Sequence, residues 1–193
     1  MRIYINDDIE HFDWQAALPL LSEQRREQCL KFKHELGRKT CAAAYLLLCD
    51  ALRQEYGITE RPVFDYGEHG KPTIVGHPDI HFNLSHCREA AICVVGPQPV
   101  GVDVESIRPY KESLARYTMN DEELAAIAAS DNPARMFIRF WTMKEAVLKL
   151  TGDGIRNDMK SVLTTAVKCE GKSIHIETTV NDSKGYVYSV AKY

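Results

Sequence analysis

Three carboxylates and one lysine stand at spacings that suit chemistry on a phosphate group. Asp103 and Glu105 are two residues apart in VGVDVE (100–105), and Glu145 and Lys149 are four apart in FWTMKEAVLKLTGDGI (140–155). Neighbouring acids repel unless they are neutralised, and Mg²⁺ is commonly held by a few carboxylates together with substrate phosphates. A lysine adds a positive charge for a phosphate oxygen. These four residues are the minimum set for metal-assisted phosphate chemistry.

The first acidic pair lies in a segment that reads as a strand. Residues two apart on a strand point to the same face, so Asp103 and Glu105 project together while Val102 and Val104 face the other way. An edge strand with one face in water would give the same pattern. The acidic pair alone is therefore weak evidence for a metal site.

The second pair lies on a predicted helix, residues 133–151, which Asn132 can cap and Gly152 can end. Glu145 and Lys149 are four apart, so they share one face, in the orientation that suits an exposed ion pair. Such a pair usually marks only a solvated helix face. Its combination with the upstream acids, the Phe140-Trp141 anchor and the exit TGDG favours a functional site.

Two upstream motifs add candidate anion contacts. The motif GKP (70–72) presents Lys71 from a turn that proline stiffens, and HFNLSH (81–86) ends an apolar strand with Ser85 and His86 at its tip. Ammonium, hydroxyl and imidazole donors so placed can meet a phosphate or nucleotide. Each motif by itself would also fit an ordinary turn.

Composition narrows the class of protein. The chain has 193 residues, of which 45% are hydrophobic, enough for a continuous core. With 26% charged residues and a net charge of -3, no global basic field indicates nucleic acid. The longest apolar run, Cys41 to Cys49, is too short for a bilayer, and the start MRIYINDDIE has no signal-type apolar region. We expect a cytoplasmic protein without nucleic-acid or membrane partners.

Cysteines and histidines do not favour a metal or disulfide framework. The six cysteines contain no CxxC pair, and several stand among apolar neighbours. His77, His81 and His86 are close in sequence, but Pro78 interrupts any helical face between the first two. Separate roles for these histidines are the more economical interpretation.

The element order predicts an α+β fold in two similar halves. Both halves read as a strand, helices and three further strands, with a change-over near GPQP (96–99). We therefore predict halves 1–97 and 98–193, which can also be classed as one domain. The first half is expected to contain a strand at 2–6, helices at 19–33 and 37–56, and strands at 63–66, 80–84 and 90–95. The second is expected to contain a strand at 100–105, helices at 111–117, 121–129 and 133–151, and strands at 161–168, 173–178 and 186–191.

With GKP, FNLSH, GVDVE and FWTMKEAVLKLTGDGI in this order, the chain closely resembles the 4'-phosphopantetheinyl transferases of the larger, surfactin-synthetase-activating type. The resemblance covers residues 20 to 165, approximately, and implies two pseudo-symmetric α+β halves with the active site between them. It also implies a reaction in which a carrier-protein serine attacks the phosphate of coenzyme A that bears pantetheine, and 3',5'-ADP leaves. The implied cofactor is Mg²⁺, with Mn²⁺ an option, and the implied partners are coenzyme A and an apo acyl or peptidyl carrier protein. We expect a monomer.

The resemblance also implies residue roles. The metal-site carboxylates would be Asp103, Glu105 and Glu145, with Glu145 also the base for the incoming serine, while Lys149 would contact the pyrophosphate and assist the leaving group. Coenzyme A contacts would come from Lys71, Ser85 and His86, and from the basic segment CLKFKHELGRKT (29–40) with Lys31, Arg38 and Lys39. Cys87 stands where relatives often have serine, so a neighbouring hydroxyl contact is not carried over.

Two other functions fit the same residues. One is a metal-dependent hydrolase of nucleotide phosphates that uses the three acids on water, and the other is a non-catalytic module that binds coenzyme A or carrier protein. Retention of all three acids and Lys149 argues against the second. Product mass after incubation with coenzyme A, Mg²⁺ and an apo carrier protein separates all three.

Overall fold

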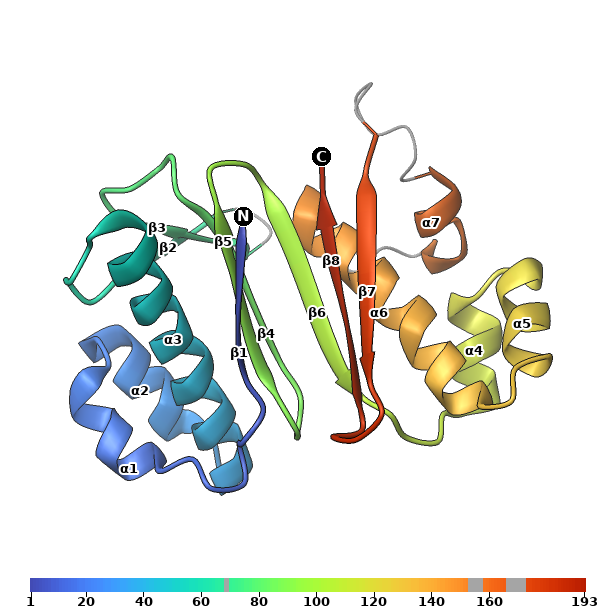
Figure 1. Ribbon diagram of the computed structural model, residues 1–193, viewed down its shortest axis with the longest axis horizontal. Coiled ribbons are helices and arrows are strands. Elements are labelled where there is room, and N and C mark those ends of the chain that lie inside the picture. The colour runs from blue at the N-terminus through green and yellow to red at the C-terminus, as the bar shows by residue number, and fades with distance from the viewer. Residues whose placement is uncertain (68–69, 153–157, 166–172) are drawn as a thin grey trace.

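The computed structural model describes residues 1–67, 70–152, 158–165 and 173–193. Within these ranges helices and sheets are mixed, and two three-stranded antiparallel sheets meet in the middle of the molecule with helices on the outer flank of each (Figure 1). None of the described helices is long and apolar enough to cross a membrane.

The sheet of the N-terminal half has the order β1-β5-β4, and a separate hairpin joins β2 to β3. Its strands are β1 (Arg2–Asn6), β2 (Phe64–Tyr66), β3 (Pro72–Ile74), β4 (His81–His86) and β5 (Ala91–Gly96). Its helices are α1 (Trp14–Ala17), a 3₁₀ turn (Leu18–Leu20), α2 (Glu23–Lys31) and α3 (Glu35–Tyr56). Helix α3 covers one face of the sheet, where Tyr45 and Leu48 share a core cluster with Phe82 and Cys93.

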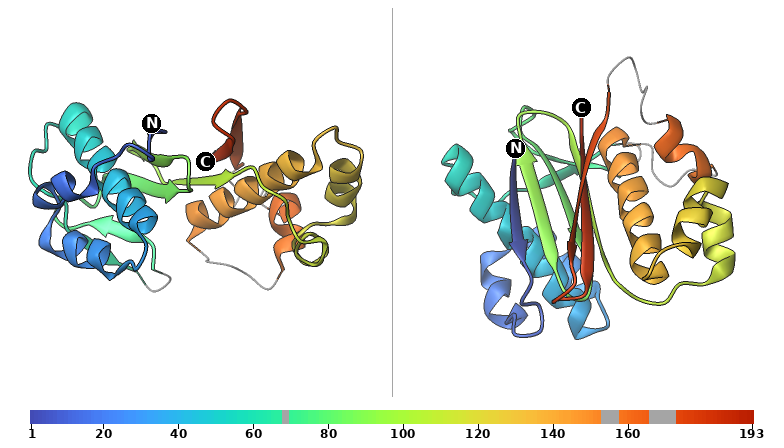
Figure 2. Two further views of the ribbon diagram at one scale, coloured as in Figure 1. Left: turned by 90° about the horizontal axis from the view of Figure 1, so that it is seen from below. Right: turned by 45° about the vertical axis from the view of Figure 1, so that its right-hand side comes forward.

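The sheet of the C-terminal half has the order β6-β8-β7. Its strands are β6 (Val100–Ser106), β7 (His175–Asn181) and β8 (Tyr186–Lys192). Its helices are α4 (Glu112–Thr118), α5 (Asp121–Ala128), α6 (Pro133–Thr151), a 3₁₀ turn (Met159–Ser161) and α7 (Val162–Thr165). Helix α6 is the long helix beside these strands, with α4, α5 and α7 further out (Figure 2). In both sheets, the first strand of the half pairs with the last, which pairs with the one before it.

Most predicted elements are present, and three expectations need correction. The predicted strand 161–168 is helical up to Thr165, the rest lying outside the described residues. Its β-branched residues favour a strand, but Met159 and Val162 are buried in the cluster under α6, so packing overrides propensity. The helix predicted at 19–33 begins only at Glu23, because the Ser22 hydroxyl accepts from Arg25 N as an N-cap. Strand β3 was not predicted, since Pro72 in a three-residue strand carries little strand signal.

Helix α6 rests directly on the backbone of β6 at Gly101. A Cβ atom there would lie 2.0 Å from the Ala146 carbonyl oxygen and 2.4 Å from Leu150 N. Only glycine permits so close an approach. Because Ala146 and Leu150 directly follow Glu145 and Lys149, this contact sets the position of both candidate site residues along β6.

The two sheets meet at their edge strands, β4 and β6, without strand pairing between them. Side chains of β4 take its place: Asn83 Oδ1 accepts from Val102 N (2.9 Å), and Ser85 Oγ accepts from Val104 N (3.2 Å). Both β4 residues are buried. Since the partners are two residues apart on both strands, these bonds fix the register of one half against the other.

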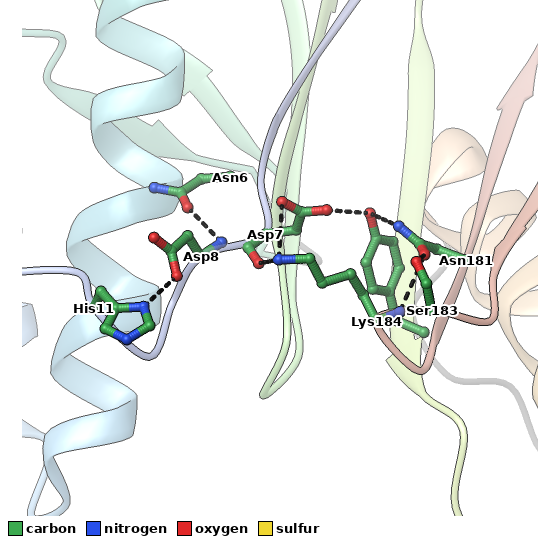
Figure 3. A network of polar contacts seen from close by, with 8 residues as sticks. Asn6, Asp7, Asp8, His11, Asn181, Ser183 and Lys184 are labelled. Atoms are coloured by element: carbon green, nitrogen blue, oxygen red, sulfur yellow. Dashed lines mark hydrogen bonds and ion pairs between the residues drawn. The ribbon is translucent and has the colours of Figure 1, made fainter.

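A second link joins the loop after β1 to the β7–β8 hairpin (Figure 3). Lys184 Nζ donates to the Asp7 carbonyl oxygen (3.2 Å), and the Tyr186 hydroxyl donates to Asp7 Oδ2 (3.2 Å). Asn181 Nδ2 donates in turn to the Tyr186 oxygen (3.1 Å). A cavity of about 570 Å³ adjoins this network, and Lys39 lines it together with Asp7 and Lys184.

Candidate active site

The three predicted acids share one region, where β6 faces α6. Asp103 is buried at 5% exposure, and Glu105 and Glu145 are half-buried. Burial raises the pKa of Glu145, and the charges of Asp103 and Glu105 raise it further. Burial, and then the charge of Asp103, likewise raise the pKa of Glu105. The pKa of Glu145 therefore responds to the charges of both other acids, and the pKa of Glu105 to that of Asp103.

Lys149 pairs with the neighbouring strand. Its Nζ lies 2.6 Å from Asp103 Oδ1 and donates to Ser85 Oγ at 3.1 Å. Its positive charge also works against the rise in the pKa of Glu145, its neighbour on α6. Lys149 therefore does not form the exposed ion pair with Glu145 that the helix spacing suggested. Its partly buried ammonium group instead neutralises Asp103 on β6.

As the side chains stand, the described residues contain no group of three acidic, histidine or cysteine side chains placed to hold one metal ion. The donor set nevertheless suits a hard cation. Asp103 Oδ2 and Glu145 Oε1 are buried oxygens without a hydrogen-bond partner, an arrangement that costs free energy unless a cation or water satisfies them. The three acids are oxygen donors of the type that Mg²⁺ prefers.

His86 ends β4 with an exposed side chain, close to two cations. Removal of water by its surroundings lowers the pKa of His86, and the charges of Arg25 and Lys149 lower it further. Arg25 comes from α2, where its Nη2 donates to the Cys41 carbonyl oxygen (3.1 Å). This arginine was not among the predicted residues, because nothing local in the sequence links α2 to the end of β4.

Lys71 connects the β2–β3 hairpin to the C-terminal half. Its Nζ donates to the Leu150 carbonyl oxygen (2.9 Å) and, more weakly, to that of Val100 (3.5 Å). Burial lowers its pKa. The predicted lysine therefore reaches the end of α6, one residue beyond Lys149.

The three weaker basic candidates have other contacts. Arg38 donates through Nε to the Phe32 carbonyl oxygen (3.0 Å) and lies over the Trp14 ring. Lys39 donates to the Glu10 carbonyl oxygen (2.6 Å), and Lys31 is exposed at the end of α2. The contacts described for these residues are with neither the acids nor His86.

An aromatic pocket of about 390 Å³ adjoins Glu105. Tyr110 and Phe137 stack at a ring-centroid distance of 4.4 Å, and Trp141 continues the stack at 6.3 Å from Phe137. Arg108 and Lys111 also line this pocket. It offers apolar surface with basic groups beside the acidic residues.

Comparison with known proteins identifies the class. Residues 99–191, which include the three acids and Lys149, match the 4'-phosphopantetheinyl transferase superfamily. The chain belongs to this superfamily and is an enzyme of the transferase class.

Several relatives are named 4'-phosphopantetheinyl transferases, in agreement with the family that the motifs resemble. The chain is 28% identical over 156 residues to 4'-phosphopantetheinyl transferase Sfp of Bacillus subtilis, covering 79% of this chain and 70% of Sfp. It is 39% identical over 150 residues to 4'-phosphopantetheinyl transferase HetI of Nostoc sp., covering 73% and 63%. It is 33% identical over 156 residues to 4'-phosphopantetheinyl transferase gsp of Aneurinibacillus migulanus, covering 79% and 65%. The chain thus spans about two thirds of the length of these relatives.

Proposed function

We propose that this chain transfers the 4'-phosphopantetheine group of coenzyme A to a serine of an apo acyl or peptidyl carrier protein, with Mg²⁺, and releases 3',5'-ADP. The observation that carries the proposal is the gathering of Asp103, Glu105, Glu145 and Lys149 where β6 faces α6. The three relatives described above, all named 4'-phosphopantetheinyl transferases, support it. We further propose that the enzyme is a monomer and acts in the cytoplasm.

The acids would hold the metal. Asp103, Glu105 and Glu145 supply the oxygens, of which two are buried and unpartnered. Bound Mg²⁺ would neutralise charge on the phosphates and help to orient them. Phosphoryl transfer depends chiefly on positioning and charge neutralisation, so no protein nucleophile is required.

Glu145 and Lys149 would act at opposite ends of the displacement. The pKa of Glu145 is raised by burial and by its acidic neighbours, which brings a carboxylate closer to the working range of a general base. Its buried Oε1 is one of the two oxygens offered to the metal, so the other carboxylate oxygen would accept the proton of the carrier serine. Lys149, one helical turn later, would contact the pyrophosphate and stabilise the charge of the departing 3',5'-ADP.

Coenzyme A would bind through cations from the N-terminal half. His86 and Arg25 are within electrostatic reach of each other, and both suit the 3'-phosphate. Lys71, whose side chain reaches from the β2–β3 hairpin to the end of α6, would contact the pyrophosphate. Lys31, Arg38 and Lys39 remain candidates for contacts further out. The aromatic pocket beside Glu105 would receive apolar side chains of the carrier protein, close to where its serine must enter.

We also propose that residues 1–97 and 98–193 are pseudo-symmetric halves with the active site at their junction. The equivalent strand orders β1-β5-β4 and β6-β8-β7 support this.

The test is incubation of the chain with coenzyme A, Mg²⁺ and an apo carrier protein, followed by mass spectrometry of protein and nucleotide. The proposal expects the carrier to gain phosphopantetheine in step with 3',5'-ADP. A hydrolase would instead release nucleotide with the carrier unmodified. A binding module would leave both reactants intact.

A further inference from the structure

We infer that Ser85 is a positioning residue that holds Asp103 and Lys149 in place, and that its hydroxyl is not a coenzyme A ligand. The inference about geometry rests on contacts within the chain alone. Its catalytic consequence rests on the proposed function. The resemblance implies a coenzyme A contact for this serine, so the two assignments make opposite predictions.

The hydrogen-bonding capacity of the Ser85 hydroxyl is filled from within the chain. The hydroxyl donates to Asp103 Oδ1 (3.0 Å) and accepts from Val104 N (3.2 Å) and from Lys149 Nζ (3.1 Å). A serine hydroxyl has one donor and two acceptor lone pairs, so all three positions are used. The side chain is also buried, at 7% exposure. A phosphate oxygen needs a donor, and the single Ser85 donor already serves a carboxylate.

These hydrogen bonds give the two carboxylate oxygens of Asp103 different environments. Oδ1 accepts from both Ser85 and Lys149, whereas Oδ2 is buried without a partner. Two bonds to one oxygen fix the orientation of the carboxylate, and that orientation keeps Oδ2 available for a cation. Ser85 thus aims Asp103 and, through the same oxygen atom, holds the Lys149 ammonium beside it.

Asn83 provides a matched comparison. It is buried on the same strand, two residues earlier, and its side chain also caps an amide of β6, that of Val102. No contact is described between Asn83 and either Asp103 or Lys149. Loss of Asn83 therefore removes the same kind of link between the halves without disturbing the acid and the lysine.

The first experiment compares Ser85→Ala, Ser85→Thr and Asn83→Ala for coenzyme A affinity by calorimetry and for single-turnover transfer to an apo carrier protein. Misplacing a reacting group by about 1 Å can cost about 10²-fold in rate. We expect Ser85→Ala to lose about that factor while its coenzyme A Kd stays within about threefold of the parent. Ser85→Thr, which keeps the hydroxyl, should recover much of the rate, and folded Asn83→Ala should transfer at close to the parent rate. A Kd increase for Ser85→Ala as large as that for His86→Ala, or equal rate losses at positions 83 and 85, overturns the inference.

The second experiment needs no activity. In the absence of metal and coenzyme A, the unfolding midpoints of Ser85→Ala, Lys149→Met and the double variant form a double-mutant cycle. Because both residues act on Asp103 Oδ1, the double variant should lose clearly less than the sum of the single losses. A cycle of Asn83→Ala with Lys149→Met should be additive. If both cycles are additive, the positioning role of Ser85 is rejected, even if the chain catalyses the transfer. If Ser85 and Lys149 are coupled and Asn83 and Lys149 are not, the positioning role holds even if the proposed transfer is not found.

Discussion

The ammonium nitrogen of Lys149 lies 2.6 Å from Oδ1 of Asp103, which joins helix α6 to strand β6 by a charged hydrogen bond that is only partly open to solvent. In the absence of a metal ion this lysine offsets the charge of Asp103, while Arg108, 3.8 Å from Glu105, offsets that of Glu105. Binding of Mg²⁺ would add positive charge at the same place, so lysine and metal stabilise the same carboxylates.

Replacement of Lys149 by methionine should therefore destabilise the metal-free protein and make it depend more on metal. A hydrogen bond to a charged group contributes about 1.5 to 3 kcal/mol, which sets the expected loss. Mg²⁺ should raise the unfolding midpoint more in Lys149→Met than in the parent, as measured by thermal denaturation with and without Mg²⁺. The control is Lys192→Met, which breaks the exposed pair with Glu177 and should change neither quantity. An equal Mg²⁺ effect in parent and Lys149→Met would contradict the shared role.

Glu145→Gln should keep the fold while it removes a metal-site charge and the proposed base. Loss of a positioned base costs about 10² to 10⁴ in rate. The measurement is single-turnover transfer at saturating coenzyme A and Mg²⁺, with circular dichroism to verify folding. If a folded Glu145→Gln variant transfers at close to the parent rate, Glu145 is neither base nor essential metal ligand.

Coenzyme A should bind more tightly as the pH falls from about 7.5 to about 6, where histidines titrate. Desolvation and the charges of Arg25 and Lys149 lower the pKa of His86, so this side chain is mostly neutral in the free protein near neutral pH. A bound phosphate favours the protonated form and raises the pKa, so binding takes up a proton. Calorimetry in two buffers with different ionisation enthalpies measures that uptake. His86→Asn should bind with little pH dependence over this range, and an unchanged pH dependence would place the titrating group elsewhere.

Gly101→Ala should push α6 away from β6, because the added methyl group would overlap the Ala146 carbonyl and Leu150 N. Overpacking typically costs about 1 to 3 kcal/mol. Since the shift also moves Glu145 and Lys149 relative to Asp103, transfer should slow even where the variant is folded. Gly67→Ala is the control, because among the described residues a Cβ there meets only the Lys71 carbonyl oxygen, at 3.8 Å. Urea unfolding and single-turnover rates for both variants give the answer, and equal behaviour of the two would refute the close-packing argument.

The buried Lys144 should be a major determinant of stability, although it directly precedes Glu145, the proposed base, in the sequence. Its Nζ pairs with Glu123 at 2.8 Å and donates to the Met159 carbonyl oxygen at 2.7 Å, with no side-chain exposure. Removal of one partner of a buried ion pair typically costs about 3 to 5 kcal/mol, which is the loss expected for Lys144→Met in urea unfolding. Addition of Glu123→Gln should recover part of it, because the uncompensated charge is then gone. A loss no larger than that of Arg116→Met, in an exposed pair with Glu112, would contradict this.

The sequence predicted much of the secondary structure, because capping residues and turn formers mark where helices and strands begin and end. Asn132 and Gly152 bound α6 as predicted, and the two-residue spacing of Asp103 and Glu105 placed both on one strand. Packing decided the segment 159–165, where burial of Met159 and Val162 produced helix in place of the predicted strand. The four motifs and their order along the chain were enough to indicate the superfamily, because the resemblance depends on residue types and spacing and not on tertiary contacts.

Tertiary structure alone decided which of these residues touch. The helix spacing suggested that Lys149 would face Glu145, but the close approach at Gly101 and the Ser85 bonds to β6 bring Lys149 to Asp103. Arg25 approaches His86 from a helix far away in the sequence, where no local pattern records the contact. Spacing along the chain fixes the face on which a side chain lies. The partner across the junction depends on how the two halves pack against each other, in part through a buried cluster that joins Ile92 and Val94 to Val102 and Val104.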